Sequence, residues 1–141
     1  MIIRLNYYKV EFKCINNKLM FKTGILTKQY LIICDKVVLV HTNKSDYDLE
    51  IIIVTTTNFR NKSLRKVDNN FLKRYPRIKS NLDYLNRVNG EEDRKYYFQI
   101  VRRGGLKKYL LLDCIYKNCV KAIYTEQSIQ NIKIARGQTI V

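Results

Sequence analysis

The stretch that decides the fold is YKVEFKCINNKLMFK, residues 8–22 of a chain of 141 residues. Apolar and charged residues alternate over residues 8–14, which is the period-two pattern of a strand with one buried face. Asn16-Asn17 follows, and asparagine tolerates the positive φ that a two-residue turn requires. Apolar residues then return at residues 19–21. The stretch therefore predicts an antiparallel hairpin.

Three more apolar runs follow this hairpin, at residues 30–34, 37–41 and 49–57. Each has the length and the β-branched or aromatic content of a strand. Short antiparallel strands at this spacing favour a meander that curls into a small roll or barrel.

A change to helical spacing begins at residue 67. Apolar residues recur at this spacing over residues 67–75, and Pro76 ends the segment. A second short helix is expected to begin with Ser80 or Asn81 as its cap and to end at Asn89-Gly90.

The last part of the chain predicts a strand, a turn and further helices. Residues 94–101 have strand character, and Gly104-Gly105 is expected to form a hairpin turn. A helical stripe of apolar residues runs over residues 111–122, and Thr125 is expected to cap a last helix. Residues 106–112 fit either a strand or the first turns of a helix.

Length and composition indicate one α+β domain over residues 1–141. A β-rich part (1–66) precedes a mixed part of short helices, a hairpin and C-terminal helices (67–141). The chain is 46% hydrophobic and contains one proline and five glycines, so we expect no long flexible linker.

The strand-turn-strand order of FKCINNKLMFKTGILT, residues 12–27, resembles the bacterial pleckstrin-homology-like (PH-like) domains. The likeness continues through LIICDKVVLV, residues 31–40, and the strand at residues 49–57. It covers roughly residues 6–80 and consists of strands and turns. The resemblance implies a small β-roll closed by a helix, and an interaction module rather than an enzyme. It carries over no functional residue.

The formal net charge is +15, from 27 Lys and Arg against 12 Asp and Glu. A field of this strength favours a polyanionic partner. The chain is also rich in Asn, Ile and Tyr, a mixture that AT-rich coding produces and in which lysine accumulates without selection for binding. Both interpretations stay open.

Two basic segments, residues 59–79 and 94–108, are the candidate binding surface. Lys and Arg neutralise phosphates, and exposed aromatic rings stack on unpaired bases. Alternatively, the rings face the core and the charges lie on a solvated face. The candidate polyanion-binding residues are Arg60, Lys62, Arg65, Lys66, Lys73, Arg74, Arg77, Lys79, Arg102, Arg103, Lys107 and Lys108, and the candidate stacking residues are Tyr96 and Phe98.

No motif for catalysis, a metal or a cofactor is recognisable. The single histidine, His41, lies in an apolar run and is expected to be a hydrogen-bonded strand residue. Asp48 and Glu50 would share one face of a strand, an arrangement that metal-dependent nucleases use. The cysteines lack metal-ligand spacing and are expected to be reduced and structural. They are Cys14, Cys34, Cys114 and Cys119.

These features favour a non-enzymatic binding module whose basic face meets a polyanion, with nucleic acid ahead of anionic lipid. A structural or assembly protein that contacts acidic protein partners is the alternative, and a small metal-dependent nuclease is a weaker one. We expect no cofactor. Residues 1–6 lack a signal-peptide pattern, and the longest apolar runs are far below the ~20 residues that span a bilayer, so a cytoplasmic location is expected.

Overall fold

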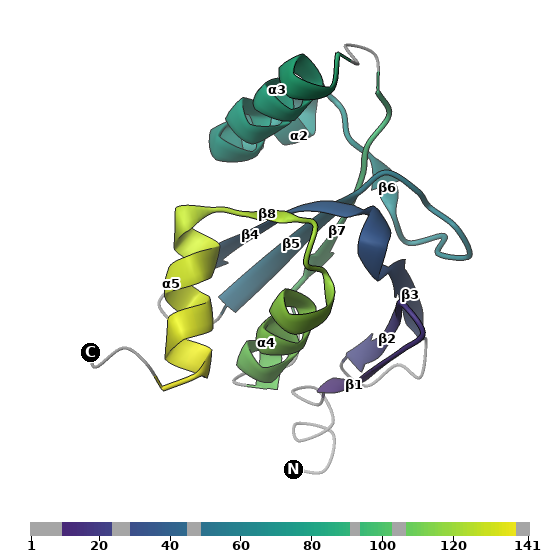
Figure 1. Cartoon of the computed structure of the whole chain (residues 1–141), viewed down its shortest axis with the longest axis vertical. Helices are drawn as coiled ribbons and strands as arrows, with labels where there is room; N and C mark the ends of the chain where they lie inside the picture. The colour runs from purple at the N-terminus through teal and green to yellow at the C-terminus, as the bar shows by residue number, and fades with distance from the viewer. Residues whose placement is uncertain (1–9, 24–28, 45–48, 91–93, 103–106, 138–141) are drawn as a thin grey trace.

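A computed structural model describes residues 10–23, 29–44, 49–90, 94–102 and 107–137. Its centre is a five-stranded sheet with helices on both faces (Figure 1). Helices α2 and α3 cover one face. Helices α4 and α5 cover the other, and a separate three-stranded sheet packs beside α4. No helix among the described residues is both long and apolar enough to cross a bilayer.

The three-stranded sheet contains β1 (Val10–Ile15), β2 (Lys18–Thr23) and β3 (Tyr30–Ile33), all antiparallel. Asn16 and Asn17 connect β1 to β2 with φ angles of 52° and 68°. The predicted hairpin and its positive-φ turn are therefore confirmed.

The five-stranded sheet has the order β6-β7-β5-β4-β8. Only the β4–β8 pair is parallel, and the other neighbours are antiparallel. A short 3-10 helix, η1 (Cys34–Lys36), leads from the first sheet into the second. The strands are β4 (Val37–Lys44), β5 (Leu49–Thr55), β6 (Arg65–Lys66), β7 (Tyr97–Val101) and β8 (Ile123–Tyr124).

The α+β class is confirmed, but the predicted barrel is not formed by the described strands. They make two separate sheets, because η1 redirects the chain after β3, and β4 pairs with β5 and β8 instead of β3. The likeness to PH-like domains stays a prediction.

Helix α2 (Asn69–Arg74) begins at Asp68, whose Oδ1 accepts a hydrogen bond from the backbone N–H of Phe71 at 2.8 Å. This cap satisfies one of the free amides at the helix start. The C-cap of α2, Tyr75, is also the N-cap of the next helix, so the two helices follow each other directly.

Helix α3 (Pro76–Asn89) starts earlier than the sequence suggested. Proline suits the first helical position, because its fixed φ is helical and the N–H it lacks would be unpaired there. Ser80 and Asn81 lie inside the helix and donate to carbonyls one turn back. The helix ends as predicted at Gly90, with φ of 67°.

Helices α4 (Lys108–Asn118) and α5 (Glu126–Ala135) complete the fold. Thr125 caps α5 as predicted, accepting from the backbone N–H of Ser128. The described part of 106–112 is helical. Gly104-Gly105 lies outside the described residues, but a helix follows it, so the expected hairpin partner of β7 is absent from the described chain.

Two hydrophobic cores lie on opposite faces of the five-stranded sheet. Ile51 and Ile53 of β5 face the core shared with α4, α5 and the three-stranded sheet. Ile52 and Val54 face the core under α2 and α3. All four side chains are fully buried, so β5 is the centre of the molecule.

Replacing Gly90 with alanine tests the end of α3. A Cβ at this position meets nothing within 4 Å, so only the left-handed backbone opposes the substitution. We expect Gly90→Ala to lower the free energy of unfolding by about 1 kcal/mol, measured by urea denaturation. Val88→Ala, on the exposed side of the same helix, is the control and should change it by less than about 0.5 kcal/mol. Equal effects of the two changes would contradict this account of the helix end.

Candidate polyanion-binding site

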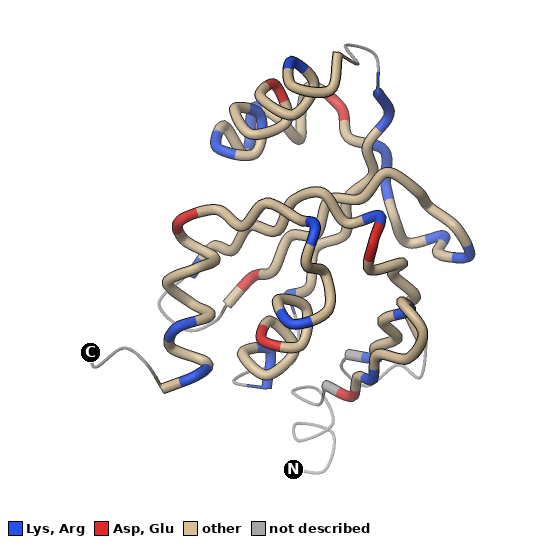
Figure 2. The backbone as a smooth tube through the Cα atoms, in the orientation of Figure 1, with Lys and Arg blue, Asp and Glu red and all other residues tan. Residues whose placement is uncertain are grey.

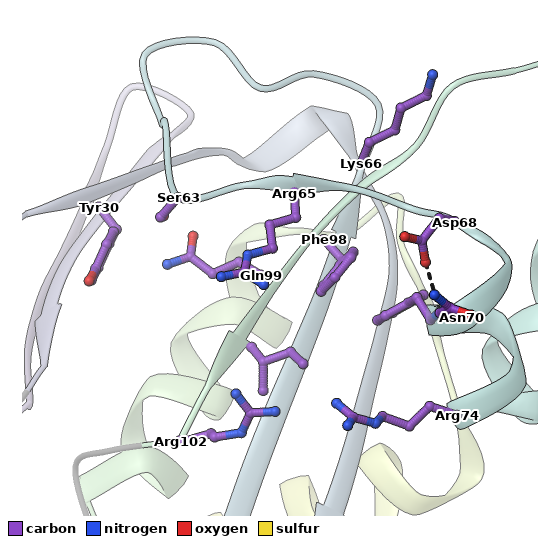
Figure 3. A pocket seen from close by; sticks show the side chains of 12 residues that line it. Tyr30, Ser63, Arg65, Lys66, Asp68, Asn70, Arg74, Phe98, Gln99 and Arg102 are labelled. Atoms are coloured by element: carbon purple, nitrogen blue, oxygen red, sulfur yellow. Dashed lines mark hydrogen bonds between the residues drawn. The ribbon is translucent and has the colours of Figure 1, made fainter.

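A groove of about 520 Å³ lies between α2 and the β6–β7 edge of the five-stranded sheet (Figure 3). Its walls come from segments that are far apart in the sequence. The lining residues are Tyr30, Ser63, Arg65, Lys66, Asp68, Asn70, Phe71, Arg74, Phe98, Gln99, Ile100 and Arg102.

Four of the lining residues are cations, supplied by three regions of the fold. Arg65 and Lys66 form β6, Arg74 ends α2, and Arg102 follows β7. In Figure 3 the side chains of Arg74 and Arg102 point toward one another, whereas Lys66 points outward. Two predicted basic segments thus meet at one concave surface.

The cations of the groove have few carboxylate partners. Arg102 Nε donates to Glu50 Oε2 at 2.9 Å. Within the described residues, Arg65, Lys66 and Arg74 make no ion pair. Three positive charges at the groove or its rim therefore form no ion pair with a carboxylate of the described residues.

Asn61 fixes the loop that carries β6 to the edge of the sheet. It is buried, and its Nδ2 donates to the backbone carbonyl of Leu31 and to Oε1 of Gln99, both at 2.9 Å. Its Oδ1 accepts from the backbone N–H of Ser63 at 3.0 Å. These bonds join the loop to β3 and β7. Arg65 comes directly after this anchored loop in the chain.

Glu50 does not line the groove but bonds one of its cations. Its carboxylate accepts from the Tyr75 hydroxyl at 3.1 Å and from Arg102. Burial and the neighbouring Glu50 carboxylate raise the pKa of Tyr75, which keeps the phenol protonated. Glu50 therefore orients Arg102, the cation at the end of β7.

The nuclease alternative gains no support from these residues. Glu50 is already bound to a tyrosine and an arginine, and Asp48 lies outside the described residues. In the described part of the chain, no group of three or more His, Cys, Asp or Glu side chains is arranged to hold a metal ion.

The remaining predicted cations that the structure describes do not line the groove. Those of the first segment are exposed on other surfaces. They are Arg60, Lys62, Lys73, Arg77 and Lys79. Lys107 is exposed just before α4, and Arg103 lies outside the described residues.

Lys108 is a correction to the predicted surface. Its side chain is fully buried at the start of α4, and its Nζ donates to the backbone carbonyl of Arg102 at 2.6 Å. A buried amine held by a carbonyl does not reach a polyanion. Lys108 instead fixes the backbone next to a groove residue, because a buried donor needs a partner.

The two predicted stacking residues have different environments. Tyr96 is only 5% exposed, and its hydroxyl donates to Asn86 Oδ1, so its ring belongs to the core and is covered against stacking. Phe98 is partly buried and lines the groove. It stacks on Phe71 of α2 with ring centroids 3.9 Å apart and planes at 21°.

Sequence reasoning missed four neutral polar residues that line the groove, which are Tyr30, Ser63, Asn70 and Gln99. Tyr30 belongs to the three-stranded sheet, and Gln99 faces Asn61 across the sheet edge. No local pattern joins these residues, because only the packing of the two sheets and α2 brings them together.

His41 is a hydrogen-bonded strand residue, as predicted. It is buried, with Nδ1 2.8 Å from Thr125 Oγ1 and Nε2 3.1 Å from Asn43 Oδ1. Burial lowers the pKa of His41; Arg77 lowers it further, while the hydrogen bond to Asn43 and the Glu50 charge oppose the shift. The neutral imidazole therefore connects β4 to the start of α5.

Comparison with known proteins gave no match: no family model, curated protein or solved structure matches this chain. The function is therefore argued from the groove itself.

Lowering the pH tests the neutral state of His41. Because the folded-state pKa lies below the unfolded value of about 6.5, the unfolded chain takes up more protons as the pH falls. We expect the free energy of unfolding to decrease as the pH drops below about 6.5, and to level off below the folded-state pKa. Urea denaturation between about pH 8 and 5 measures this. His41→Gln removes the chain's single imidazole and should flatten the profile; parallel profiles would contradict the assignment.

Proposed function

We propose that this protein is a non-enzymatic binding module that holds nucleic acid through the groove between α2 and the β6–β7 edge. One observation carries the proposal. Arg65, Arg74 and Arg102 come from separate elements and meet at one concave surface, where Asp68 is the one carboxylate among the described lining residues.

Arginine suits this role because its planar guanidinium donates two parallel hydrogen bonds to phosphate oxygens. A concave wall excludes part of the surrounding water and strengthens the attraction of each charge. Figure 2 shows Lys and Arg on every layer of the fold. This wider positive field supports long-range attraction of a polyanion, and the groove supplies its contact point.

The size of the groove favours a single strand over a duplex. A volume of about 520 Å³ lies in the range of sites for small molecules, which suits one or two nucleotides. Phe98 adds an aromatic surface, and the amide of the exposed Asn70 adds a polar group that can meet a base or sugar. The bases of a duplex are paired and stacked, so they make poor contact with the groove's aromatic and polar groups.

Charge reversal at the groove tests this function. In the variant R65E/K66E/R74E, we expect affinity for a labelled mixed-sequence single strand to fall on the order of 100-fold. The slope of log K against log salt should become less steep by about 2, since each phosphate contact on a single strand contributes about 0.7. Fluorescence anisotropy at ~50 and ~200 mM salt measures both quantities for the single strand and the matching duplex.

A control variant with the same change in net charge separates the groove from the general field. K36E/K121E/K133E alters exposed lysines that do not line the groove, and should weaken binding less than tenfold. Equal losses of affinity in both variants would show that the groove is not the binding site. If the parent protein bound no nucleic acid at low salt, nucleic acid would be excluded as the partner, and binding to anionic vesicles would then indicate lipid.

Asp68 gives a second test, in the opposite direction. Its carboxylate lines the groove and caps α2. Asparagine caps as well as aspartate, so Asp68→Asn removes the negative charge and keeps the helix start. We expect the affinity for a single strand to rise about threefold and the thermal midpoint to change little. Unchanged or weaker binding by the folded variant would place the polyanion away from α2.

A further inference from the structure

The four cysteines converge on one part of the first core, although they are spread over more than 100 positions of the sequence. Cys34 and Cys119 are buried in that core, and Cys14 and Cys114 pack against it. They belong to β1, to η1, to α4 and to the residue that follows α4. All four are free thiols.

Two of these thiols are in direct contact. The sulfur atoms of Cys14 and Cys34 lie 3.5 Å apart, so a shift of about 1.5 Å brings them to the length of a disulfide bond. Both backbones are held by the same hairpin. Cys14 pairs with Leu19 across the β1–β2 ladder, and the Cys34 N–H donates to the carbonyl of Asn17 at 2.9 Å.

The surroundings of the thiols assign an order of reaction. Cys14 is partly exposed, whereas Cys34 is 1% and Cys119 is 0% exposed. Burial and the Cys34 thiol raise the pKa of Cys14 to about 11. The Cys119 thiol and burial raise the pKa of Cys34 above its usual range. Within the Cys14–Cys34 pair, an oxidant in solution therefore reaches Cys14 first, and it reacts slowly because little thiolate is present.

We propose that Cys14 and Cys34 are a disulfide-forming pair that is oxidised by thiol–disulfide exchange with a small disulfide such as oxidised glutathione. The Cys14 thiolate attacks one sulfur of the oxidant, whose S–S bond breaks and releases one glutathione thiol. Cys34 loses a proton and attacks Cys14 in this mixed disulfide, which releases the second glutathione thiol. Two protein thiols are oxidised to one disulfide, and one oxidant disulfide is reduced to two thiols.

The new bond would close the loop from β1 to η1, across the three-stranded sheet. Because η1 leads directly into β4, the bond would also fix the connection between the two sheets. Closing a loop of this length restricts the unfolded chain, so we expect the thermal midpoint to rise by on the order of 10 °C.

The experiment uses the full, reduced chain incubated with oxidised glutathione under native conditions. Remaining thiols are then alkylated, and the protein is analysed by intact mass and peptide mapping. We expect the loss of two hydrogen atoms, two alkylated cysteines (Cys114 and Cys119), a Cys14–Cys34 cross-link and the rise in thermal midpoint. Cys14→Ser should abolish the cross-link. Cys114→Ser is the matched control and should retain it.

Three outcomes would overturn the proposal. One is four alkylated thiols after prolonged incubation. Another is a stable glutathione adduct at Cys14, which would show that Cys34 does not resolve it. The third is a cross-link between Cys34 and Cys119. The peptide map of the parent protein decides among these without any variant, so a poorly folding substitution does not affect the test.

Discussion

The complete burial of β5 is the constraint on which the rest of the structure depends. Its four central residues, from Ile51 to Val54, are inaccessible to solvent, and the strand pairs with β4 and β7 on its two sides. A strand that is apolar on both faces requires cover on both faces. The helix pairs α2–α3 and α4–α5 meet this need, and the three-stranded sheet extends the second cover.

The same strand connects the core to the candidate site. Glu50 is the one residue of β5 that is partly exposed, and its carboxylate accepts hydrogen bonds from Arg102 and the hydroxyl of Tyr75. Arg102 and Arg74 lie at opposite sides of the groove, and Tyr75 directly follows Arg74. One carboxylate thus holds a groove residue, Arg102, and the residue that follows Arg74.

Local features were the most predictable from the sequence. The Asn16-Asn17 turn, the Thr125 cap and the Gly90 helix end depend on the conformations of a few adjacent residues, and all three occur where expected. The parallel pairing of β8 with β4 joins residues more than 80 positions apart, and no local pattern encodes it. When this pairing is unknown, a run of short strands favours a roll or barrel. The barrel prediction was wrong for this reason.

The candidate site shows the same division. The basic residues were easy to find in the sequence, but the directions of their side chains were not. Lys108 is buried, whereas Arg102, six positions earlier, lines the groove. The two aromatic residues, which are two positions apart in the chain, also differ in their packing. The ring of Tyr96 is buried, whereas Phe98 stacks on Phe71 and lines the groove.

The groove also bears on the two interpretations of the +15 charge. Drift in base composition adds lysine at exposed positions throughout a chain, and most of the cations here are dispersed in that way (Figure 2). Arg65, Arg74 and Arg102 differ from these dispersed cations, because the order β6-β7-β5 and the placement of α2 bring them to one concave surface. Three of the four groove cations are arginines, although the chain as a whole is rich in lysine, and arginine is the better donor to phosphate. The fold therefore gathers part of the positive charge at one concave surface, where arginine predominates.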